Sequence, residues 1–278
     1  MNLFTQLIFK IVFYPLPLRI LFFKNLLKSM KWIKYSTRLE YDAVTRPSYG
    51  FCIYNAAILA KSLGHSKISI LEFGVAGGNG LVNIEKHVSE ISKELKMEFE
   101  IYGFDMGSGL PKPLDYRDMP YMWAEGFYKM DKELLEKKLK YAKLIIGNVS
   151  ETCKNFFSKN NPAPIGCIMF DLDYYSSTID SFKIFESQQK NYLPRVYCYF
   201  DDIASNALRA NNDFVGVLRA IHEFNEVNKI KKIGKIKGLS VSRQIPSSWH
   251  DHIFVMSDFK HSQFNDFIGN SHQSIPLQ

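Results

Sequence analysis

The sequence has few cysteines and no cysteine pattern that predicts a metal or disulfide framework. Disulfide scaffolds and zinc modules need closely and regularly spaced cysteines. Only four occur in 278 residues, at positions 52, 153, 167 and 198, and none forms a C-x-x-C pair. We therefore expect a reducing compartment, which makes a cytoplasmic protein the simplest prediction.

Acidic residues are absent from the first 38 positions, which contain seven lysines and arginines. The whole chain has a formal net charge of +7, so residues 39–278 are balanced in charge. The basic character therefore belongs to an N-terminal arm, residues 1–38. Nothing in this distribution indicates a nucleic-acid groove in the main body, and we expect no nucleic-acid partner.

The arm also lacks an uninterrupted apolar run long enough to span a membrane, because Lys10 and Arg19 interrupt it and Pro15 and Pro17 break a helix near its middle. It has no small-residue cleavage site of a signal peptide. Beyond Pro17, apolar residues recur at helical spacing opposite lysines, which indicates a basic amphipathic helix. Such a helix can lie on an anionic membrane surface, which for this chain would be the inner face of the membrane. It can instead pack on the protein's own core, or on a second copy in a homo-oligomer. The pattern leaves these alternatives open.

From about residue 50, helical and strand patterns alternate, which predicts an α/β fold with a parallel sheet between helices. The predicted strands are 67–73, 98–105, 143–146, 165–171, 196–200 and 252–256, and the predicted helices are 51–63, 81–95, 150–158, 177–190 and 214–227. A long connection at 106–130 contains three prolines and several aromatic residues, and we interpret it as a candidate lid. We expect one domain over 39–264, followed by a polar tail at 265–278.

The segment LEFGVAGGNG, residues 71–80, directly follows the first predicted strand. Its glycines allow a ligand to approach the backbone closely, and the next helix offers free N–H groups. Ala76 and Asn79 stand where a dinucleotide fingerprint needs glycine. Glu72 instead supplies a carboxylate just before the first glycine of the turn. A nucleoside ligand that carries a cationic sulfonium and an amino acid would need a carboxylate at this position. A tight turn without a ligand is the simpler alternative, which four glycines in seven residues make less attractive.

Acidic residues follow three other predicted strands. Asp105 ends one of them, where a carboxylate can accept hydrogen bonds from ribose hydroxyls. Asp171 and Asp173 follow a later strand, and Asp201 and Asp202 follow the next. Because parallel strands end at the same edge of a sheet, we expect the last four carboxylates to cluster. Such a cluster raises carboxyl pKa values unless a divalent cation such as Mg²⁺, Mn²⁺ or Ca²⁺ binds. Capping of helices is the alternative role for individual members.

Five segments in order, LEFGVAGGNG, YGFDMGSGLP, GNVSET, FDLDYYSST and YFDDI, resemble class I S-adenosylmethionine-dependent methyltransferases. They are most similar to the macrocin O-methyltransferase family, whose members are metal-dependent and methylate sugar hydroxyls. The resemblance covers about residues 48–262 and implies a Rossmann-like, doubly wound sheet of seven strands with an antiparallel last strand. It also implies S-adenosyl-L-methionine and Mg²⁺, or another divalent cation, as cofactors and a small-molecule or glycan acceptor.

The resemblance further implies roles for individual residues. The glycine turn would hold the methionine part of the donor, Asp105 its ribose, and residues 147–149 would border the adenine. The implied donor-binding residues are Glu72, Gly74, Ala76, Gly77, Gly78, Asp105, Met106, Gly147, Asn148, Val149 and Asp171. The implied metal ligands are Asp173, Asp201 and Asp202, with Asp173 also the catalytic base and the choice between Asp171 and Asp173 as ligand left open.

The sequence departs from the family pattern at the acceptor end. YFDDI replaces a more common Asp-Asp-Tyr ending, and residues 203–213 differ from the family loop. Two other functions also fit parts of the chain. Asp171-Leu172-Asp173 matches the D-x-D motif of metal-dependent glycosyltransferases, which do not need the glycine turn. A non-catalytic donor-binding scaffold at a membrane surface would explain the arm but not the intact carboxylates.

Overall fold

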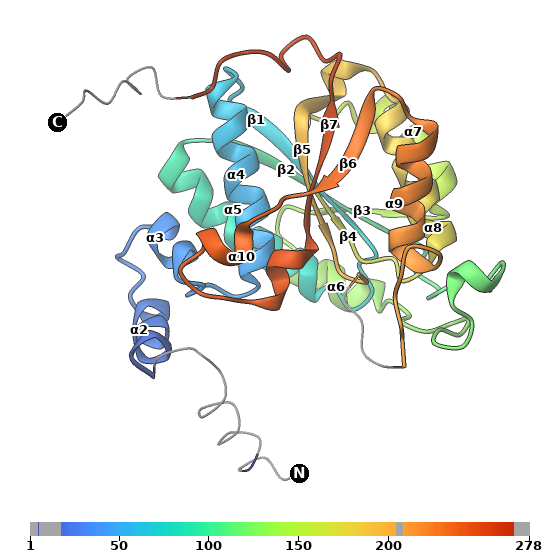
Figure 1. Cartoon of the computed structure of the whole chain (residues 1–278), viewed down its shortest axis with the longest axis horizontal. Helices are drawn as coiled ribbons and strands as arrows, with labels where there is room; N and C mark the ends of the chain where they lie inside the picture. Colours follow the sequence, from blue (N-terminus) through green and yellow to red (C-terminus); the bar gives the residue numbers. More distant parts are fainter. Residues whose placement is uncertain (1–4, 6–17, 204–207, 270–278) are drawn as a thin grey trace.

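The structure, a computed structural model, describes residues 5, 18–203 and 208–269 and contains a seven-stranded sheet of order β3-β2-β1-β4-β5-β7-β6 (Figure 1). The strands are β1 (Lys67–Phe73), β2 (Glu98–Asp105), β3 (Lys143–Ile146), β4 (Ile165–Phe170), β5 (Tyr192–Phe200), β6 (Lys231–Lys235) and β7 (Ile253–Asp258). Strands β1 to β5 pair in parallel, and β7 is antiparallel to both β5 and β6. The predicted doubly wound α/β fold with an antiparallel last strand is confirmed.

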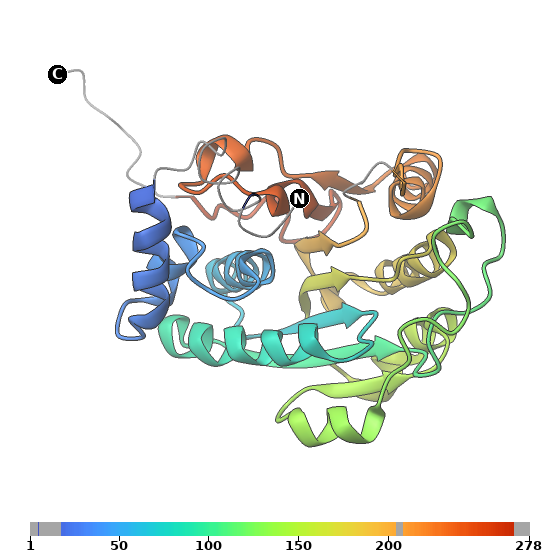
Figure 2. The same cartoon turned by 90° about the horizontal axis from the view of Figure 1, so that it is seen from below.

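Helices cover both faces of the sheet, to its left and right in Figure 1 and as layers in Figure 2. One face packs against α3 (Tyr35–Glu40), α4 (Pro47–Ser62), α5 (Asn79–Leu95), α6 (Lys132–Lys138) and α10 (Leu239–Ser242). The other packs against α7 (Val149–Asn160), α8 (Tyr175–Ser181) and α9 (Gly216–Val227). Helix α2 (Leu18–Ser29) precedes these, and short 3-10 turns cover Tyr116–Asp118, Phe182–Glu186, Gln189–Asn191 and Ser248–His252.

Along each strand, successive side chains point alternately into two hydrophobic cores, because side chains of a β-strand alternate between its two faces. In β1, Ile68 and Ile70 lie in the core with α4 and α5, whereas Leu71 and Phe73 lie in the core with α7, α8 and α9. All four side chains are fully buried. A strand covered on both faces is apolar at nearly every position, which is why KISILEF is recognisable in the sequence.

Four buried phenylalanines stand side by side at the end of the sheet. Phe104, Phe73, Phe170 and Phe200 are register partners on β2, β1, β4 and β5. The Phe73 and Phe170 ring centroids lie 5.5 Å apart, and those of Phe170 and Phe200 4.6 Å apart, with nearly parallel planes. The next residues of these strands therefore leave the sheet at one level: Asp105, Gly74, Asp171 and Asp201.

Several elements differ from the sequence prediction, including the helix predicted at 177–190, which is α8 (Tyr175–Ser181) followed by the 3-10 turn Phe182–Glu186. Strand β6 (Lys231–Lys235) was not predicted, because Ile233 is its one buried residue and KKIGK shows no clear alternation. Strand β5 begins at Tyr192, before its predicted start, and passes through Pro194 near a register shift against β4. Helix α4 begins at Pro47 rather than at residue 51, since proline suits the first turn of a helix.

The last part of the predicted arm belongs to the domain. Tyr35 and Arg38 of α3 are buried. The Tyr35 hydroxyl lies 2.7 Å from Nδ1 of His87, and Arg38 pairs with Glu90, both on α5. The domain therefore begins before residue 39.

The part of α2 nearest the domain presents one buried apolar side chain, Leu27, and Trp32 beyond it is 80% exposed. The rest of the predicted arm, 1–4 and 6–17, and the tail from 270 lie outside the described residues. Among the described residues, none of the helices has the length and apolar character needed to cross a bilayer.

Candidate active site

A cavity of about 530 Å³ lies where β1, β2, β4 and β5 end, and we call it the strand-end cavity. It sits at the point where the strand order reverses between β1 and β4, which is the usual ligand position in a doubly wound sheet. Every residue that the sequence indicated for the donor or the metal lines it: Glu72, Gly74, Ala76, Gly77, Gly78, Asp105, Met106, Gly147, Asn148, Val149, Asp171, Asp173, Asp201 and Asp202.

Two positions in the segment after β1 require glycine, because neighbouring atoms leave no space for a Cβ. Gly74 has a φ of +84°, and a Cβ there would lie 1.7 Å from the backbone oxygen of Asp171. A Cβ on Gly80 would lie 1.8 Å from Oε1 of Glu72. The glycines therefore bring the turn against β4 and leave space for a buried carboxyl group.

Glu72 is a buried carboxyl group with one unpartnered oxygen. The Tyr49 hydroxyl donates to its Oε1 at 3.1 Å, whereas Oε2 has no hydrogen-bond partner among the described residues. Burial raises the pKa of Glu72 to about 8. An ammonium group in the cavity would satisfy the free oxygen and favour the ionised form, so Glu72 fits the amino-acid end of the expected donor.

Asp105 ties the first two strand ends together. Its Oδ2 accepts hydrogen bonds from the backbone N–H groups of Val75 and Ala76, both at 2.9 Å, and its Oδ1 accepts one from Gly107 at 2.6 Å. A carboxylate has about four acceptor positions. The three internal bonds leave room for roughly one further hydroxyl, so the carboxylate also shapes the turn.

Residues 147–149 form the wall beyond Asp105. The Gly147 N–H donates to the backbone oxygen of Asp105 at 2.9 Å. Asn148 caps α7, because its Oδ1 accepts from the Ser150 N–H at 2.9 Å. This turn therefore brings backbone from β3 to the cavity and starts a helix there.

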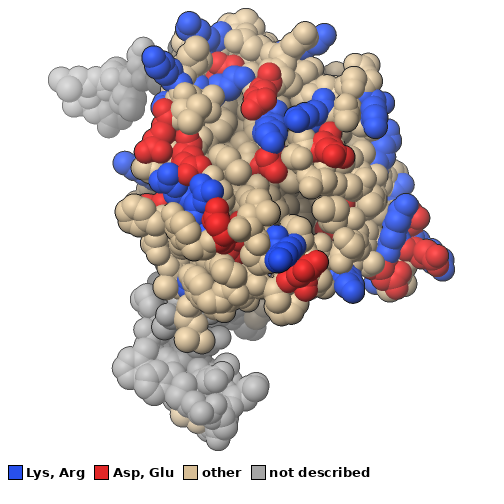
Figure 3. All heavy atoms as spheres, turned by 90° about the vertical axis from the view of Figure 1, so that its right-hand side faces the viewer, with Lys and Arg blue, Asp and Glu red and all other residues tan. Residues whose placement is uncertain are grey.

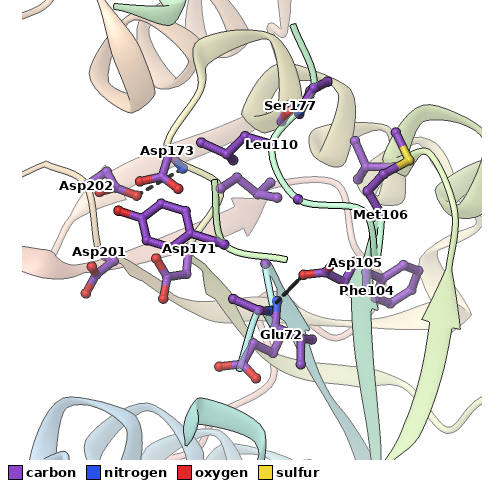
Figure 4. Close-up of a pocket in the computed structure, with 18 of the residues that line it drawn as sticks. Glu72, Phe104, Asp105, Met106, Leu110, Asp171, Asp173, Ser177, Asp201 and Asp202 are labelled. Carbon is purple, nitrogen blue, oxygen red and sulfur yellow. Dashed lines mark hydrogen bonds between the residues drawn. The ribbon is translucent and has the colours of Figure 1, made fainter. Parts of the chain in front are cut away.

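The carboxylates that follow β4 and β5 meet on one side of the cavity (Figure 4). Asp171, Asp201 and Asp202 each offer an oxygen, and these oxygens lie within 4.8 Å of one another. Asp173 lies beside them and donates its backbone N–H to Oδ2 of Asp202 at 3.0 Å. The compact group thus contains Asp171 where the predicted metal set has Asp173.

The local backbone explains that difference. Strand β4 ends at Phe170, and Asp173 adopts a left-handed conformation with a φ of 58°. The alternation of a β-strand would keep Asp171 and Asp173 on one side, but it does not continue beyond Phe170.

Crowding makes these carboxyl groups reluctant to ionise together. Burial and neighbouring carboxylates raise the pKa of Asp173 to about 8 and that of Asp202 to about 6, and they raise that of Asp171 well above its usual range. Arg209 offsets part of the charge, with Nη1 at 3.2 Å from Oδ1 of Asp202. Hard oxygen ligands gathered in this way fit a divalent cation such as Mg²⁺.

The 106–130 segment contributes part of the wall near the carboxylates. Leu110, Trp123 and Tyr128 line the cavity, and Nε1 of the buried Trp123 has no hydrogen-bond partner among the described residues. Tyr116 and Tyr121, two other aromatic residues of the segment, are exposed and do not line it.

Two polar residues of the same segment anchor it to the domain. Arg117 donates to the Tyr175 hydroxyl at 2.8 Å and pairs with Glu223. Asp118 accepts hydrogen bonds from Ser176, through the backbone N–H at 2.8 Å and the hydroxyl at 2.9 Å. Both residues therefore hold the segment against α8 and α9.

The lining residues that sequence reasoning missed include Arg46, Tyr128 and Arg209. Arg46 directly precedes the proline that starts α4, so only a helix boundary marks it in the sequence. Arg209 lies in the 203–213 segment that departs from the family pattern. Arg209 pairs with Asp202, and its guanidinium carbon lies 4.7 Å from the ring centroid of Trp123.

No family model matches the chain, and no curated protein matches it. Solved structures do match. CalS11, described as a calicheamicin methyltransferase, is 17% identical, and the alignment covers 92% of this chain and 91% of CalS11 with a TM-score of 0.50. NovP, described as an O-methyltransferase, is 12% identical over 76% of this chain and 79% of its own, with a TM-score of 0.49. At 17% identity, the similarity to CalS11 establishes a common fold, the Rossmann-like α/β fold.

The state of Glu72 can be tested through the pH dependence of stability. A carboxyl group whose pKa rises from 4.5 to about 8 on folding holds its proton more tightly in the folded chain. It therefore stabilises the fold below the lower value, and this contribution is lost as the pH rises toward the higher one. Between about pH 5 and about pH 8, with EDTA present, the Tm of the wild-type protein should fall more steeply than that of Glu72→Gln.

The exposed Glu133→Gln variant serves as the control for removing a carboxylate. It should keep the wild-type slope. Parallel Tm profiles for Glu72→Gln and the wild type would contradict a protonated Glu72.

Proposed function

We propose that this chain is an S-adenosylmethionine-dependent O-methyltransferase that methylates a hydroxyl of a sugar or glycan with the help of a divalent cation. The observation that carries the proposal is the continuity of one cavity. The glycine turn, Glu72 and the carboxylate group all line it, and Glu72 lies near enough to Asp171 to act on it electrostatically. The shared fold with methyltransferase structures is consistent with this reading.

Each part of the donor has chemically suitable neighbours in the cavity. The unpartnered oxygen of Glu72 suits the ammonium group, and Asp105 has room for a ribose hydroxyl. Met106 and residues 147–149 provide backbone and apolar surface for adenine. When bound, the donor supplies an electrophilic methyl group on a positively charged sulfur.

The carboxylates would handle the acceptor. The acceptor loses a proton from its hydroxyl, a C–O bond to the methyl group forms, and the C–S bond breaks with its electron pair left on sulfur. Asp173 accepts the proton as general base. Asp171, Asp201 and Asp202 would hold the divalent cation, which would polarise an acceptor hydroxyl as a Lewis acid. Restricted positions for both reactants would supply much of the rate.

The side chains near Asp173 suit a sugar. The cavity wall there includes the rings of Trp123 and Tyr128 and the guanidinium of Arg209. An aromatic ring packs against the apolar face of a sugar, and the Trp123 N–H can donate to a hydroxyl. These residues support a glycan-type acceptor.

The proposal predicts that Asp173→Asn lowers the rate of methyl transfer without weakening donor binding. The substitution removes the base but keeps the size of the side chain, so transfer should fall roughly 10²–10⁴-fold. Binding of S-adenosylhomocysteine should remain unchanged in calorimetry. Transfer is measured with donor that carries a tritiated methyl group and glycans extracted from cells.

Asp266→Asn, an exposed position outside the cavity, is the matched control and should transfer at the wild-type rate. Wild-type transfer by Asp173→Asn would refute the assigned base. Binding of a uridine diphosphate sugar in place of S-adenosylhomocysteine would instead favour the glycosyltransferase reading.

We also propose that the N-terminal side contacts an anionic membrane surface. A second hollow, of about 1190 Å³, lies between the arm, α5 and the segment after α6, and we call it the basic groove. Its lining includes seven lysines: Lys28, Lys31, Lys34, Lys86, Lys93, Lys138 and Lys140. None of them forms a salt bridge within the described part of the chain.

The acidic residues of the groove are already engaged. Glu85 accepts hydrogen bonds from three backbone N–H groups, Glu90 pairs with Arg38, and Glu94 accepts from Ser36 and Tyr54. The side of the molecule away from α2 and α3 differs, because basic and acidic side chains are interspersed there (Figure 3). An unbalanced basic surface beside the exposed Trp32 is typical of a contact with anionic lipid headgroups.

The membrane proposal predicts that neutralising groove lysines weakens vesicle binding. Each lysine near an anionic surface contributes ~1 kcal/mol, so replacing Lys28, Lys31, Lys86 and Lys93 by glutamine should lower the partition coefficient roughly 100-fold or more. Flotation with phosphatidylglycerol-containing vesicles measures it. The control replaces exposed lysines outside the groove: Lys154, Lys159, Lys229 and Lys237. Equal flotation of the two variants would contradict the proposal.

A further inference from the structure

We propose that Arg46 binds the carboxylate of the donor's amino-acid end, so that Arg46 and Glu72 together select a ligand that carries an intact zwitterionic amino acid. This inference rests on the proposed function and deepens it. It assigns a donor-binding residue outside the glycine turn and outside all strand ends, directly before the helix that precedes β1.

The backbone at Arg46 is unusual for an arginine. Arg46 is the residue before the first turn of α4 and has a left-handed conformation, with φ 47° and ψ 66°. Its side chain makes no capping hydrogen bond to the helix. Glycine or asparagine adopts this conformation at lower cost. A strained, non-capping arginine at the edge of a cavity therefore points to a use for its guanidinium group.

The guanidinium lies next to the amino-acid end of the cavity. Arg46 lines the strand-end cavity together with Glu72 and Gly77. Its guanidinium carbon lies 5.1 Å from the ring centroid of Tyr49, and the Tyr49 hydroxyl donates to Oε1 of Glu72 at 3.1 Å. The ring of Tyr49 thus holds the cationic group and the carboxyl group on one side of the cavity.

The guanidinium retains its donors for a ligand. Arg46 forms no salt bridge, and its side chain donates no hydrogen bond, within the part of the chain that the structure describes. Glu72 and Asp171 are the acidic groups that act on it electrostatically.

An α-amino acid matches this pair of groups. Its ammonium and carboxylate sit on one carbon, so they require an acceptor and a donor close together on the same wall. The unpartnered oxygen of Glu72 accepts from the ammonium group, and the planar guanidinium can bind a carboxylate through two parallel hydrogen bonds. A nucleoside that lacks the amino acid would leave both groups without partners.

Two ligands that differ only in the amino-acid part test the assignment. S-adenosylhomocysteine carries it, and 5′-methylthioadenosine keeps the adenosine and the thioether without it. Calorimetry should show that Arg46→Gln weakens S-adenosylhomocysteine binding roughly 10–100-fold, the usual range for a charged hydrogen-bonded contact. The affinity for 5′-methylthioadenosine should stay at the wild-type value.

Two further variants keep the test decisive. Arg46→Lys retains the charge without the paired donors and should lose less affinity for S-adenosylhomocysteine than Arg46→Gln. Lys159→Gln removes an exposed cation outside the cavity and should bind both ligands like the wild type. A thermal melt of each variant confirms that it is folded.

The outcomes separate the inference from the proposed function. Equal weakening of both ligands by Arg46→Gln, or no weakening of either, would overturn the assignment while donor binding by the wild type still supports the methyltransferase proposal. If the wild type binds neither ligand, the proposed function fails and this assignment fails with it.

Discussion

The register of four parallel strands is the constraint on which the strand-end cavity depends. Just beyond the stacked phenylalanines of β1, β4 and β5, backbone hydrogen bonds still join neighbouring strands. The N–H of Gly74 donates to the carbonyl oxygen of Phe104 at 2.9 Å. The N–H groups of Asp171 and Asp201 donate in the same way to Phe73 at 2.9 Å and to Phe170 at 3.0 Å. A slip of one residue would exchange the buried faces of a strand and move its acidic residue into a core. Packing of the two cores therefore also sets the distances between the turn, Asp105 and the carboxylates.

The cavity concentrates negative charge that the protein itself neutralises only in part. Glu72 is buried with one oxygen unsatisfied, and the aspartates interact with two cations, Arg209 with Asp202 and Arg46 with Asp171. Such an arrangement costs stability when the carboxyl groups ionise without partners. A cationic donor and a divalent cation bound in neighbouring parts of the cavity would each remove part of that cost. The same electrostatics thus explains the raised pKa values and the preference for positively charged ligands.

The sequence predicted most of the fold and the location of the site because both depend on local patterns. Strands buried on two faces are apolar throughout, and the residues of the cavity directly follow them in chain order. The features that the sequence did not predict depend on tertiary structure. Strand β6 has a single buried residue, Ile233. Arg46 and Tyr128 reach the cavity from a helix boundary and from the 106–130 segment. The exchange of Asp171 for Asp173 follows from a left-handed residue that no spacing rule reveals.

The account makes one central claim: a nucleoside with an amino acid and a divalent cation occupy neighbouring parts of a single cavity. Anomalous diffraction from crystals grown with S-adenosylhomocysteine and Mn²⁺ tests this claim most directly. We predict nucleoside density along the glycine turn and one manganese peak between the oxygens of Asp171, Asp201 and Asp202. Nucleoside density elsewhere on the molecule, or a manganese peak away from these carboxylates, would contradict the account.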